Sequence, residues 1–315
     1  MISHLSSTQV SVLDSPWHLS QAEISQFDKL GFVKLEQRIP KSLLEQLIHG
    51  AERLNDLAFE QLEQAKQNPD FVFNKSLFFT FLNRALHFNL YAQLPALDVL
   101  GCPQVLAIAE SLCGTNFIPT IDMMVFKHQH NHAVIPWHQD LIYPSEQYRI
   151  ATIGIYLDDA EQDDGALQIL PQTQHHKQDI CAIIDAKPKN YVQLSAKAGD
   201  IIVHNPMCVH SSNTLNHQKL RRTLYYECRP IESLFINKDW NEQLISQRLG
   251  LLNLATTQYR TNHPEQSPFK LRHQLPPNLS HLLPSKVTPS AKTLSDCYFT
   301  PLPFDSANAC HRKSN

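Results

Sequence analysis

The sequence lacks any run of about 18 consecutive apolar residues, the length that a membrane-spanning helix requires. Its start, MISHLSSTQVSVLDSPWHLS, has neither a basic beginning nor a continuous apolar segment, so a secretory signal is not expected. Basic residues are not in excess either, because 27 Lys and Arg stand against 30 Asp and Glu, for a net charge of −3. Such a balance provides no positive field for nucleic acid or anionic lipid. We therefore expect a protein whose partners include neither nucleic acid nor a membrane.

Cysteine pairs of the CxxC type are also missing. The seven cysteines are scattered, and their odd number argues against a disulfide framework and against a zinc site. They are Cys102, Cys113, Cys181, Cys208, Cys228, Cys297 and Cys310. This usage is typical of a reducing compartment, so we expect a cytoplasmic protein. The 42% of hydrophobic and 18% of charged residues predict a globular chain with a sizeable core.

The N-terminal third, residues 17–113, predicts helices. Ser20 and Glu23 have the spacing of a capping box that opens a short helix, and Gly31 fits its end. After a short strand at residues 32–35, Pro40 is placed to begin a long helix with leucines at three- and four-residue spacings. Residues 95–113 form another helical region, which ends at Gly114.

Beyond residue 115 the pattern changes to short segments rich in β-branched and aromatic residues, separated by turn residues. These segments are 117–127, 150–157, 166–170, 200–204 and 222–228. They predict an antiparallel barrel or sandwich over about residues 115–230. A helix follows at about 240–259, and the Pro-rich residues 261–315 predict an extended, partly disordered arm. We therefore expect a single domain over residues 1–260.

One set of residues has the pattern of a metal site. His138 and Asp140, two residues apart in the segment WHQD, form with the distant His210 a set of two histidines and one carboxylate. Alternate side chains of an extended segment leave the same face, so His138 and Asp140 can reach one metal while a facing strand supplies His210. This set is typical of non-haem Fe(II) sites, where three coordination positions stay open. Arg221 follows shortly after His210, where it can hold the far end of a dicarboxylate co-substrate.

Other histidines offer rival sets, because the chain has 17 of them. His128, His130 and His132 also alternate, and we interpret them as part of a loop of solvated polar residues. His204 ends an apolar, strand-like segment, and we interpret it as a residue that closes a buried strand. From the histidines alone, a closed cupin site or a zinc hydrolase remains open.

Five segments in order resemble a known family. They are FDKLGFVKLEQRIPKSLLEQL near the start, PWHQDLIY at 136–143, DDGALQILPQTQHH at 163–176, AGDIIVHNPMCVHSSN at 198–213 and LRRTLYYECRP at 220–230. Together they resemble the phytanoyl-CoA dioxygenase family of Fe(II)- and 2-oxoglutarate-dependent oxygenases. The resemblance implies a mainly β fold, a double-stranded β-helix or jelly-roll core with flanking helices. It also implies that decarboxylation of 2-oxoglutarate by O2 is coupled to oxidation of a substrate.

The resemblance also implies roles for single residues. His138, Asp140 and His210 match the iron ligands, and Arg221 matches the arginine that binds the distal carboxylate of 2-oxoglutarate. A guanidinium suits this role because it donates two parallel hydrogen bonds to a carboxylate. Arg222 is the second choice for it, should the strand register differ. Ser212, Tyr156 and Met123 match other positions around the co-substrate.

We therefore predict a 2-oxoglutarate-dependent dioxygenase that hydroxylates, or otherwise oxidises, a small organic substrate with release of succinate and CO2. Lys127, Tyr143 and Arg149 are candidates for substrate contact near the mouth of the site. Two alternatives remain: an oxygenase of the same chemistry that acts on a protein side chain, and a non-catalytic jelly-roll protein that binds a ligand. A halogenase is disfavoured, because that variant replaces the carboxylate ligand and Asp140 is present.

Overall fold

The computed structural model describes residues 15–75, 80–92, 94–131, 134–140, 147–175, 180–186, 188–217, 220–236, 240–284 and 288–298. The α-helices are α1 (Gln21–Leu30), α2 (Lys41–Glu60), α3 (Leu62–Gln67), α4 (Phe88–Ala92), α5 (Leu94–Gly101), α6 (Pro103–Cys113), α7 (Ile180–Asp185), α8 (Ile231–Leu234), α9 (Glu242–Asn262) and α10 (Ala291–Asp296). Two 3-10 helices, η1 (Gln129–Asn131) and η2 (Pro277–Leu282), complete the helical elements of these ranges.

The strands form two antiparallel sheets. They are β1 (Phe32–Leu35), β2 (Phe71–Lys75), β3 (Thr80–Leu86), β4 (Phe117–His128), β5 (Ile135–His138), β6 (Ala151–Tyr156), β7 (Leu167–Ile169), β8 (Val192–Leu194), β9 (Ile201–His204), β10 (His210–Ser212) and β11 (Leu220–Pro230). The larger sheet has the order β1-β9-β6-β11-β4-β3-β2, and the smaller one has the order β5-β10-β7-β8. This is the mainly β architecture with flanking helices that the sequence predicts, and neither sheet closes into a barrel.

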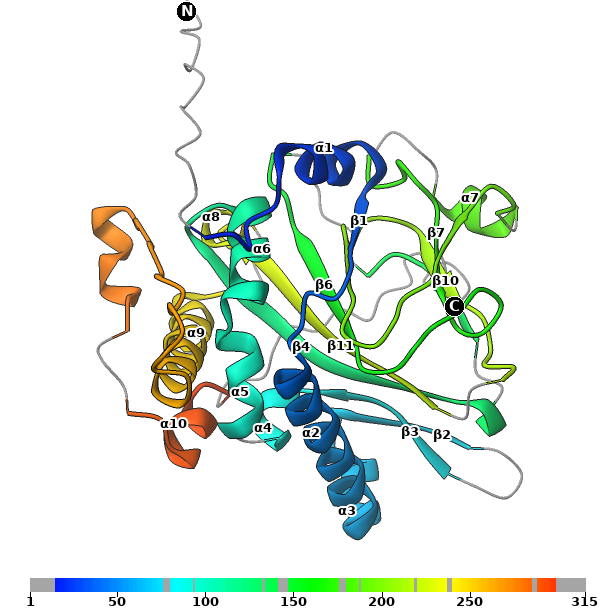
Figure 1. Ribbon diagram of the computed structural model, residues 1–315, viewed down its shortest axis with the longest axis horizontal. Coiled ribbons are helices and arrows are strands. Elements are labelled where there is room, and N and C mark those ends of the chain that lie inside the picture. The colour runs from blue at the N-terminus through cyan, green and yellow to red at the C-terminus, as the bar shows by residue number, and fades with distance from the viewer. Residues whose placement is uncertain are drawn as a thin grey trace, which may run out of the picture.

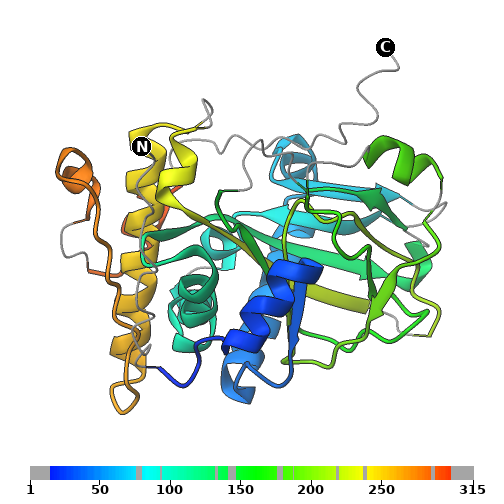
Figure 2. The same cartoon turned by 90° about the horizontal axis from the view of Figure 1, so that it is seen from above.

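The larger sheet separates the hydrophobic core from the functional cavity. Side chains alternate between the two faces of a strand, so neighbouring residues of β4 and β11 have opposite surroundings. Met124, Phe126 and Tyr226 pack into the main core with the helices. Met123 and Tyr225, which are paired across β4 and β11, point instead into a cavity between the sheets. Figures 1 and 2 show most of the helices, among them α5, α6 and α9, on one side of this sheet, and Figure 1 shows β7, β10 and the short α7 on the other.

The predicted helices are present, with one break. Ser20 caps α1 through the expected capping box with Glu23, and Gly31 ends it in the left-handed region at φ 85°. A Cβ at Gly31 would collide with the thiol of Cys208, so this glycine also allows α1 to lie close to the turn before β10. The predicted helical region 95–113 is two helices, because the chain turns at Cys102 and restarts at Pro103.

Some elements were not predicted. The hairpin of β2 and β3 extends the larger sheet beyond β4, and it lies within residues 17–113, for which the sequence predicts helices. After α9, residues 263–284 and 288–298 run along the outside of the helical layer with the short η2 and α10. Polar contacts hold this arm, including Arg272 to Glu110 at 2.7 Å and the hydroxyl of Tyr298 to Asp122 at 2.9 Å.

The cysteines of the described ranges are mostly buried thiols. Cys102, Cys113, Cys208, Cys228 and Cys297 are free and buried. Burial raises the pKa of the Cys297 thiol to about 11, which keeps it protonated and unreactive. Cys181 on α7 is disulfide-bonded, so one crosslink is present in a chain for which we expected no disulfide framework. No helix of the described residues is long and apolar enough to span a bilayer.

Candidate metal centre

Three elements bring the predicted ligands together. His138 is the last residue of β5, Asp140 lies two residues beyond it, and His210 opens β10. β5 and β10 are neighbours in the smaller sheet, with His138 opposite His210. The backbone N–H of Asp140 donates to the carbonyl of Pro206 at 2.9 Å, which fixes the loop after β5 against the loop before β10. Backbone pairing thus brings the distant His210 beside His138 and Asp140.

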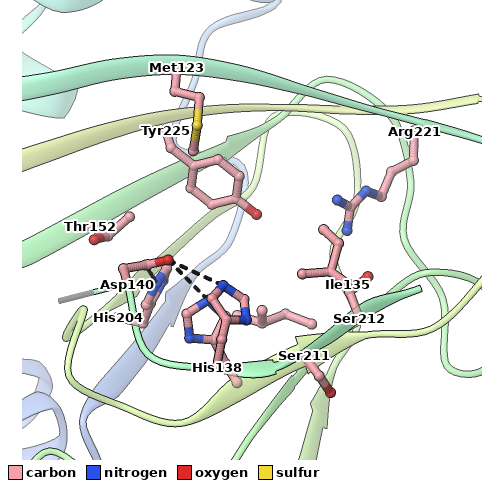
Figure 3. Close-up of a pocket in the computed structure, with 12 residues that line it drawn as sticks. Met123, Ile135, His138, Asp140, Thr152, His204, Ser211, Ser212, Arg221 and Tyr225 are labelled. Carbon is pink, nitrogen blue, oxygen red and sulfur yellow. Dashed lines mark hydrogen bonds and ion pairs between the residues drawn. The ribbon is translucent and has the colours of Figure 1, made fainter. Parts of the chain in front are cut away.

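The ligand atoms converge on one point. Nε2 of His138 lies 3.3 Å and Nε2 of His210 lies 3.6 Å from Oδ1 of Asp140. One ligand atom from each of the three residues lies within 4.8 Å of the other two (Figure 3). Neighbouring ligands of a six-coordinate metal with bonds of about 2.1 Å are about 3 Å apart, so the observed spacings suit one face of such an ion. The donor set and its geometry fit Fe(II).

Each histidine is oriented by its second nitrogen. Nδ1 of His138 donates to the carbonyl of Pro136 at 2.8 Å, and Nδ1 of His210 donates to the carbonyl of Cys208 at 2.9 Å. A neutral imidazole that donates through Nδ1 presents an unprotonated Nε2, the form that binds a metal. Both rings therefore turn their lone pairs toward Asp140 and toward each other.

The electrostatics of the three groups favour a bound cation. Burial opposes ionisation of Asp140, yet His210, His138 and His204 together hold its pKa well below the ordinary range, so it is a carboxylate. Burial, and then the proximity of His138, lowers the pKa of His210 to about 3, so this imidazole is neutral. Burial also opposes the charge on His138, but its hydrogen bond with Asp140 raises its pKa overall. A proton therefore competes with the metal mainly at His138.

A buried guanidinium lies across the cavity from the ligands. Arg221, on β11, is 1% exposed and lines the same cavity as His138, Asp140 and His210. Its NH1 donates to the carbonyl of Gly165 at 2.6 Å, while its Nε is buried without a partner. Figure 3 shows its guanidinium directed into the cavity, near Ser212. An unpaired donor on a buried cation is costly, and an anionic ligand in the cavity would satisfy it.

Gly165 and Ser212 shape this end of the cavity. The carbonyl of Gly165 accepts hydrogen bonds from both Arg221 and the hydroxyl of Ser212, the latter at 3.1 Å. Gly165 adopts φ 80°, which favours glycine, and a Cβ there would collide with Leu215. The glycine of the DDG segment is thus required by the backbone that positions Arg221.

Lys127 provides a second buried basic side chain beside Arg221. The two residues are paired across β4 and β11, and Lys127 is 1% exposed. Its ammonium donates to the hydroxyl of Ser212 at 2.7 Å and to the carbonyls of Ser212 and Asn213. Burial, and then the charge of Arg221, lowers the pKa of Lys127 to about 6. We had considered Lys127 for substrate contact, but it lies behind Ser212 at the end of the cavity that Arg221 occupies.

Arg222 faces the other way. Its guanidinium forms two hydrogen bonds with Asp158, at 2.9 and 2.8 Å, and its backbone N–H donates to the same carboxylate. The hydrogen bond with Asp158 raises the pKa of Arg222, although burial of the guanidinium opposes its charge. Arg222 is therefore part of a closed ion pair outside the cavity, whereas Arg221 is directed into it.

The remaining sequence candidates differ in their position relative to the cavity. Met123 lines the cavity, and Tyr156 is fully buried with its ring 5.8 Å from the guanidinium of Arg221. Arg149 lies outside the cavity, in an exposed ion pair with Asp28 at 2.6 Å. Substrate contact by Arg149 stays a prediction. Tyr143 lies outside the described residues.

His204 and Tyr225 are among the cavity residues that the sequence analysis missed. His204, interpreted as a residue that only closes β9, lines the cavity and approaches Asp140. Tyr225 was not considered, although it lies four residues after Arg221 on β11 and therefore on the same face. The period of two along this strand was the signal that could have identified it. Gly154 faces Tyr225 on β6, and a Cβ there would lie 2.7 Å from the tyrosine ring, so the glycine makes room for it.

Comparison with known proteins agrees with this geometry. The family model of phytanoyl-CoA dioxygenase matches residues 27–223, which include all three metal-ligand candidates and Arg221. The sequence has no match among curated proteins.

Solved structures share the fold. EvdMO1 is 24% identical with a TM-score of 0.58; the match covers 66% of this chain but only 49% of EvdMO1, so the chain spans about half of that relative. AviO1 from Streptomyces viridochromogenes Tue57 is also 24% identical, with a TM-score of 0.56, over 66% of this chain and 93% of AviO1.

EctD from S. alaskensis, solved with 2-oxoglutarate and 5-hydroxyectoine, is 14% identical with a TM-score of 0.56. That match covers 68% of this chain and 77% of EctD. Because the family model spans more than half of the sequence, the chain belongs to the phytanoyl-CoA dioxygenase family, a family of non-haem iron enzymes that depend on 2-oxoglutarate.

Proposed function

We propose that the protein uses Fe(II), 2-oxoglutarate and O2 to hydroxylate a small organic substrate, with release of succinate and CO2. In this proposal Nε2 of His138, Oδ1 of Asp140 and Nε2 of His210 hold the iron. The observation that carries it is the convergence of these three atoms in one cavity with the buried, partly unsatisfied guanidinium of Arg221. A protein that only bound a neutral ligand would have no use for either feature.

The co-substrate fits the charge distribution of the cavity. Arg221 supplies donors for the distal carboxylate of 2-oxoglutarate, and the hydroxyl of Ser212, which donates to the carbonyl of Gly165, lies at the same end of the cavity. Lys127 lies directly behind Ser212, where a bound carboxylate would favour its protonated form. Paired, charge-assisted hydrogen bonds of this kind fix the position of a carboxylate as well as its charge. The near end of the molecule would then extend toward His138 and His210.

The iron supplies the oxidation, and the chain supplies position and a protected environment. Met123, Ile135 and Leu167 give the cavity apolar walls, which exclude water from the region between the ligands and Arg221. Among similar structures, SnoK and SnoN from nogalamycin biosynthesis are described as a carbocyclase and an epimerase. We propose hydroxylation for this chain, the outcome that requires no group beyond the iron and its co-substrate.

An anaerobic titration tests the proposal. Fe(II) followed by 2-oxoglutarate should produce a visible metal-to-ligand charge-transfer band, because chelation of the keto acid to Fe(II) creates that transition. Without the band, neither the iron nor the co-substrate assignment would survive. Admission of O2 should then convert 2-oxoglutarate to succinate, and a metabolite extract should accelerate this conversion more than a protein extract does. Acceleration by the protein extract alone would point to a protein side chain as the substrate.

A further inference from the structure

A fourth imidazole borders the metal-ligand candidates. His204 is the last residue of β9, its side chain is 2% exposed, and its Nε2 lies 3.3 Å from Oδ2 of Asp140. Its ring centroid is 4.8 Å from that of His210. Yet His204 is not among the residues whose ligand atoms lie within 4.8 Å of one another. It is therefore close to the centre without sharing the point on which the other three converge.

The two oxygens of Asp140 have different neighbours. Oδ1 faces Nε2 of His138 at 3.3 Å and Nε2 of His210 at 3.6 Å. Oδ2 faces only His204 among the residues drawn in Figure 3. One oxygen of the carboxylate thus faces the nitrogens of the two other metal-ligand candidates, and the second oxygen faces β9.

The surroundings of Nδ1 of His204 indicate which ring nitrogen donates the hydrogen bond to Asp140. Nδ1 of His138 and Nδ1 of His210 each have a carbonyl acceptor, which leaves their Nε2 atoms free to bind a metal. Nδ1 of His204 is buried with no hydrogen-bond partner in the described chain. Among the described residues the Asp140 carboxylate is the one hydrogen-bond acceptor that the ring meets, so Nε2 is the nitrogen that donates to it. An Nε2 that carries a proton donates to Oδ2 and does not bind a metal.

We propose that His204 is a positioning residue of the metal centre, which binds Oδ2 of Asp140 and reserves Oδ1 as the single carboxylate oxygen for the iron. The inference rests on the proposed function and deepens it. A carboxylate that turned and bound through both oxygens would occupy one of the positions that 2-oxoglutarate and O2 require. The turn between β9 and β10 also holds Asp140 by its backbone, because the carbonyl of Pro206 accepts a hydrogen bond from the N–H of Asp140.

Metal binding without turnover provides the test. Co(II) is titrated anaerobically into the metal-free protein, and its absorption reports both the dissociation constant and the coordination of the ion. His204→Phe and His204→Leu both remove the hydrogen-bond donor, and the two new side chains differ in volume. If one variant fails to fold, the other can still be measured. His204→Gln keeps an N–H near the position of Nε2. His87→Leu is the matched control, because His87 is a buried histidine that pairs with Asp70 at 2.9 Å, away from the cavity.

We expect His204→Phe and His204→Leu to weaken Co(II) binding about 10- to 100-fold, the usual effect of removing a residue that orients a metal ligand. The Co(II) spectrum of these variants should change, whereas His204→Gln should bind Co(II) within about threefold of the wild type. His87→Leu should leave the constant unchanged. If both donor-less variants bind Co(II) as the wild type does, His204 does not position Asp140. If His204→Gln fails as badly as His210→Ala, His204 is a ligand and the inference is wrong. In either case a charge-transfer band in the wild type would leave the proposed function standing.

Discussion

Replacing Arg221 and Arg222 separately should give opposite results, although the two residues are neighbours with the same side chain. Arg221→Met removes the charge from the cavity and keeps most of the volume, so no large void is created. This change leaves no carboxylate of the described residues unpaired, because the hydrogen-bond partner of the guanidinium among them is the carbonyl of Gly165. Arg222→Met instead strands Asp158, which loses two side-chain hydrogen bonds.

The magnitudes follow from burial. Removing one partner of a buried, hydrogen-bonded charge pair typically costs about 2–5 kcal/mol of binding, which is about 30- to 4,000-fold in the dissociation constant. Lys127 remains at the same end of the cavity in Arg221→Met, so we expect the lower part of this range, about 30- to 300-fold, for 2-oxoglutarate. The free energy of unfolding of this variant should stay the same or rise, because a buried cation is removed. Arg222→Met should lose about 1–3 kcal/mol of stability and bind 2-oxoglutarate normally.

Two assays separate these outcomes. The charge-transfer band of the Fe(II) protein, titrated anaerobically with 2-oxoglutarate, gives the dissociation constant, and urea denaturation of the metal-free protein gives the stability. The reasoning fails if Arg221→Met binds 2-oxoglutarate within threefold of the wild type. It also fails if Arg222→Met is the variant that loses the co-substrate, since the alternate faces of β11 would then be exchanged.

Three further outcomes are expected. Asp140→Ala should fold with an unchanged circular dichroism spectrum but bind no Fe(II) at micromolar concentrations; normal succinate formation by this variant would contradict the ligand assignment. Lys127, whose pKa burial lowers to about 6, is neutral at pH 8 in the empty cavity, and a carboxylate nearby raises this pKa. Binding of 2-oxoglutarate should therefore take up protons, which calorimetry in two buffers of different ionisation enthalpy detects; equal heats in both buffers would exclude it. Gly165→Ala places a Cβ at φ 80° against Leu215, so it should lower both the thermal midpoint and 2-oxoglutarate affinity, and an unchanged affinity would show that Arg221 does not depend on this carbonyl.

The regular parts of the fold could be predicted from local sequence. The capping box of Ser20 and Glu23, Pro40 before α2 and the continuous apolar run of β9 each express one short-range rule, and each gave an element close to its observed bounds. The hairpin of β2 and β3 was missed because its place in the sheet depends on pairing with β4, which is distant in the chain. Local patterns contain no information about such a partner.

The candidate site was predicted unevenly for a similar reason. His138, Asp140 and His210 could be named because their spacing and residue types are specific, and the structure brings them together. His204 could not be assigned from sequence, since a histidine that ends a buried strand has the same pattern whether or not a carboxylate lies beside it. Only the pairing of β5 with β10 and of β9 with β6 brings that carboxylate within reach.

The metal-ligand candidates and Arg221 are positioned by different strands, and this determines the distance between them. His204 ends β9, His210 begins β10 and Pro206 lies in the turn between them, so the geometry of Asp140 depends on this one strand–turn–strand segment. Arg221 depends instead on β11 and on the loop that contains Gly165. Since the larger sheet holds both β9 and β11 rigidly, the distance between the iron ligands and the guanidinium is set by strand pairing through β6. A sheet of paired strands can therefore hold a co-substrate of fixed length between two independently built ends.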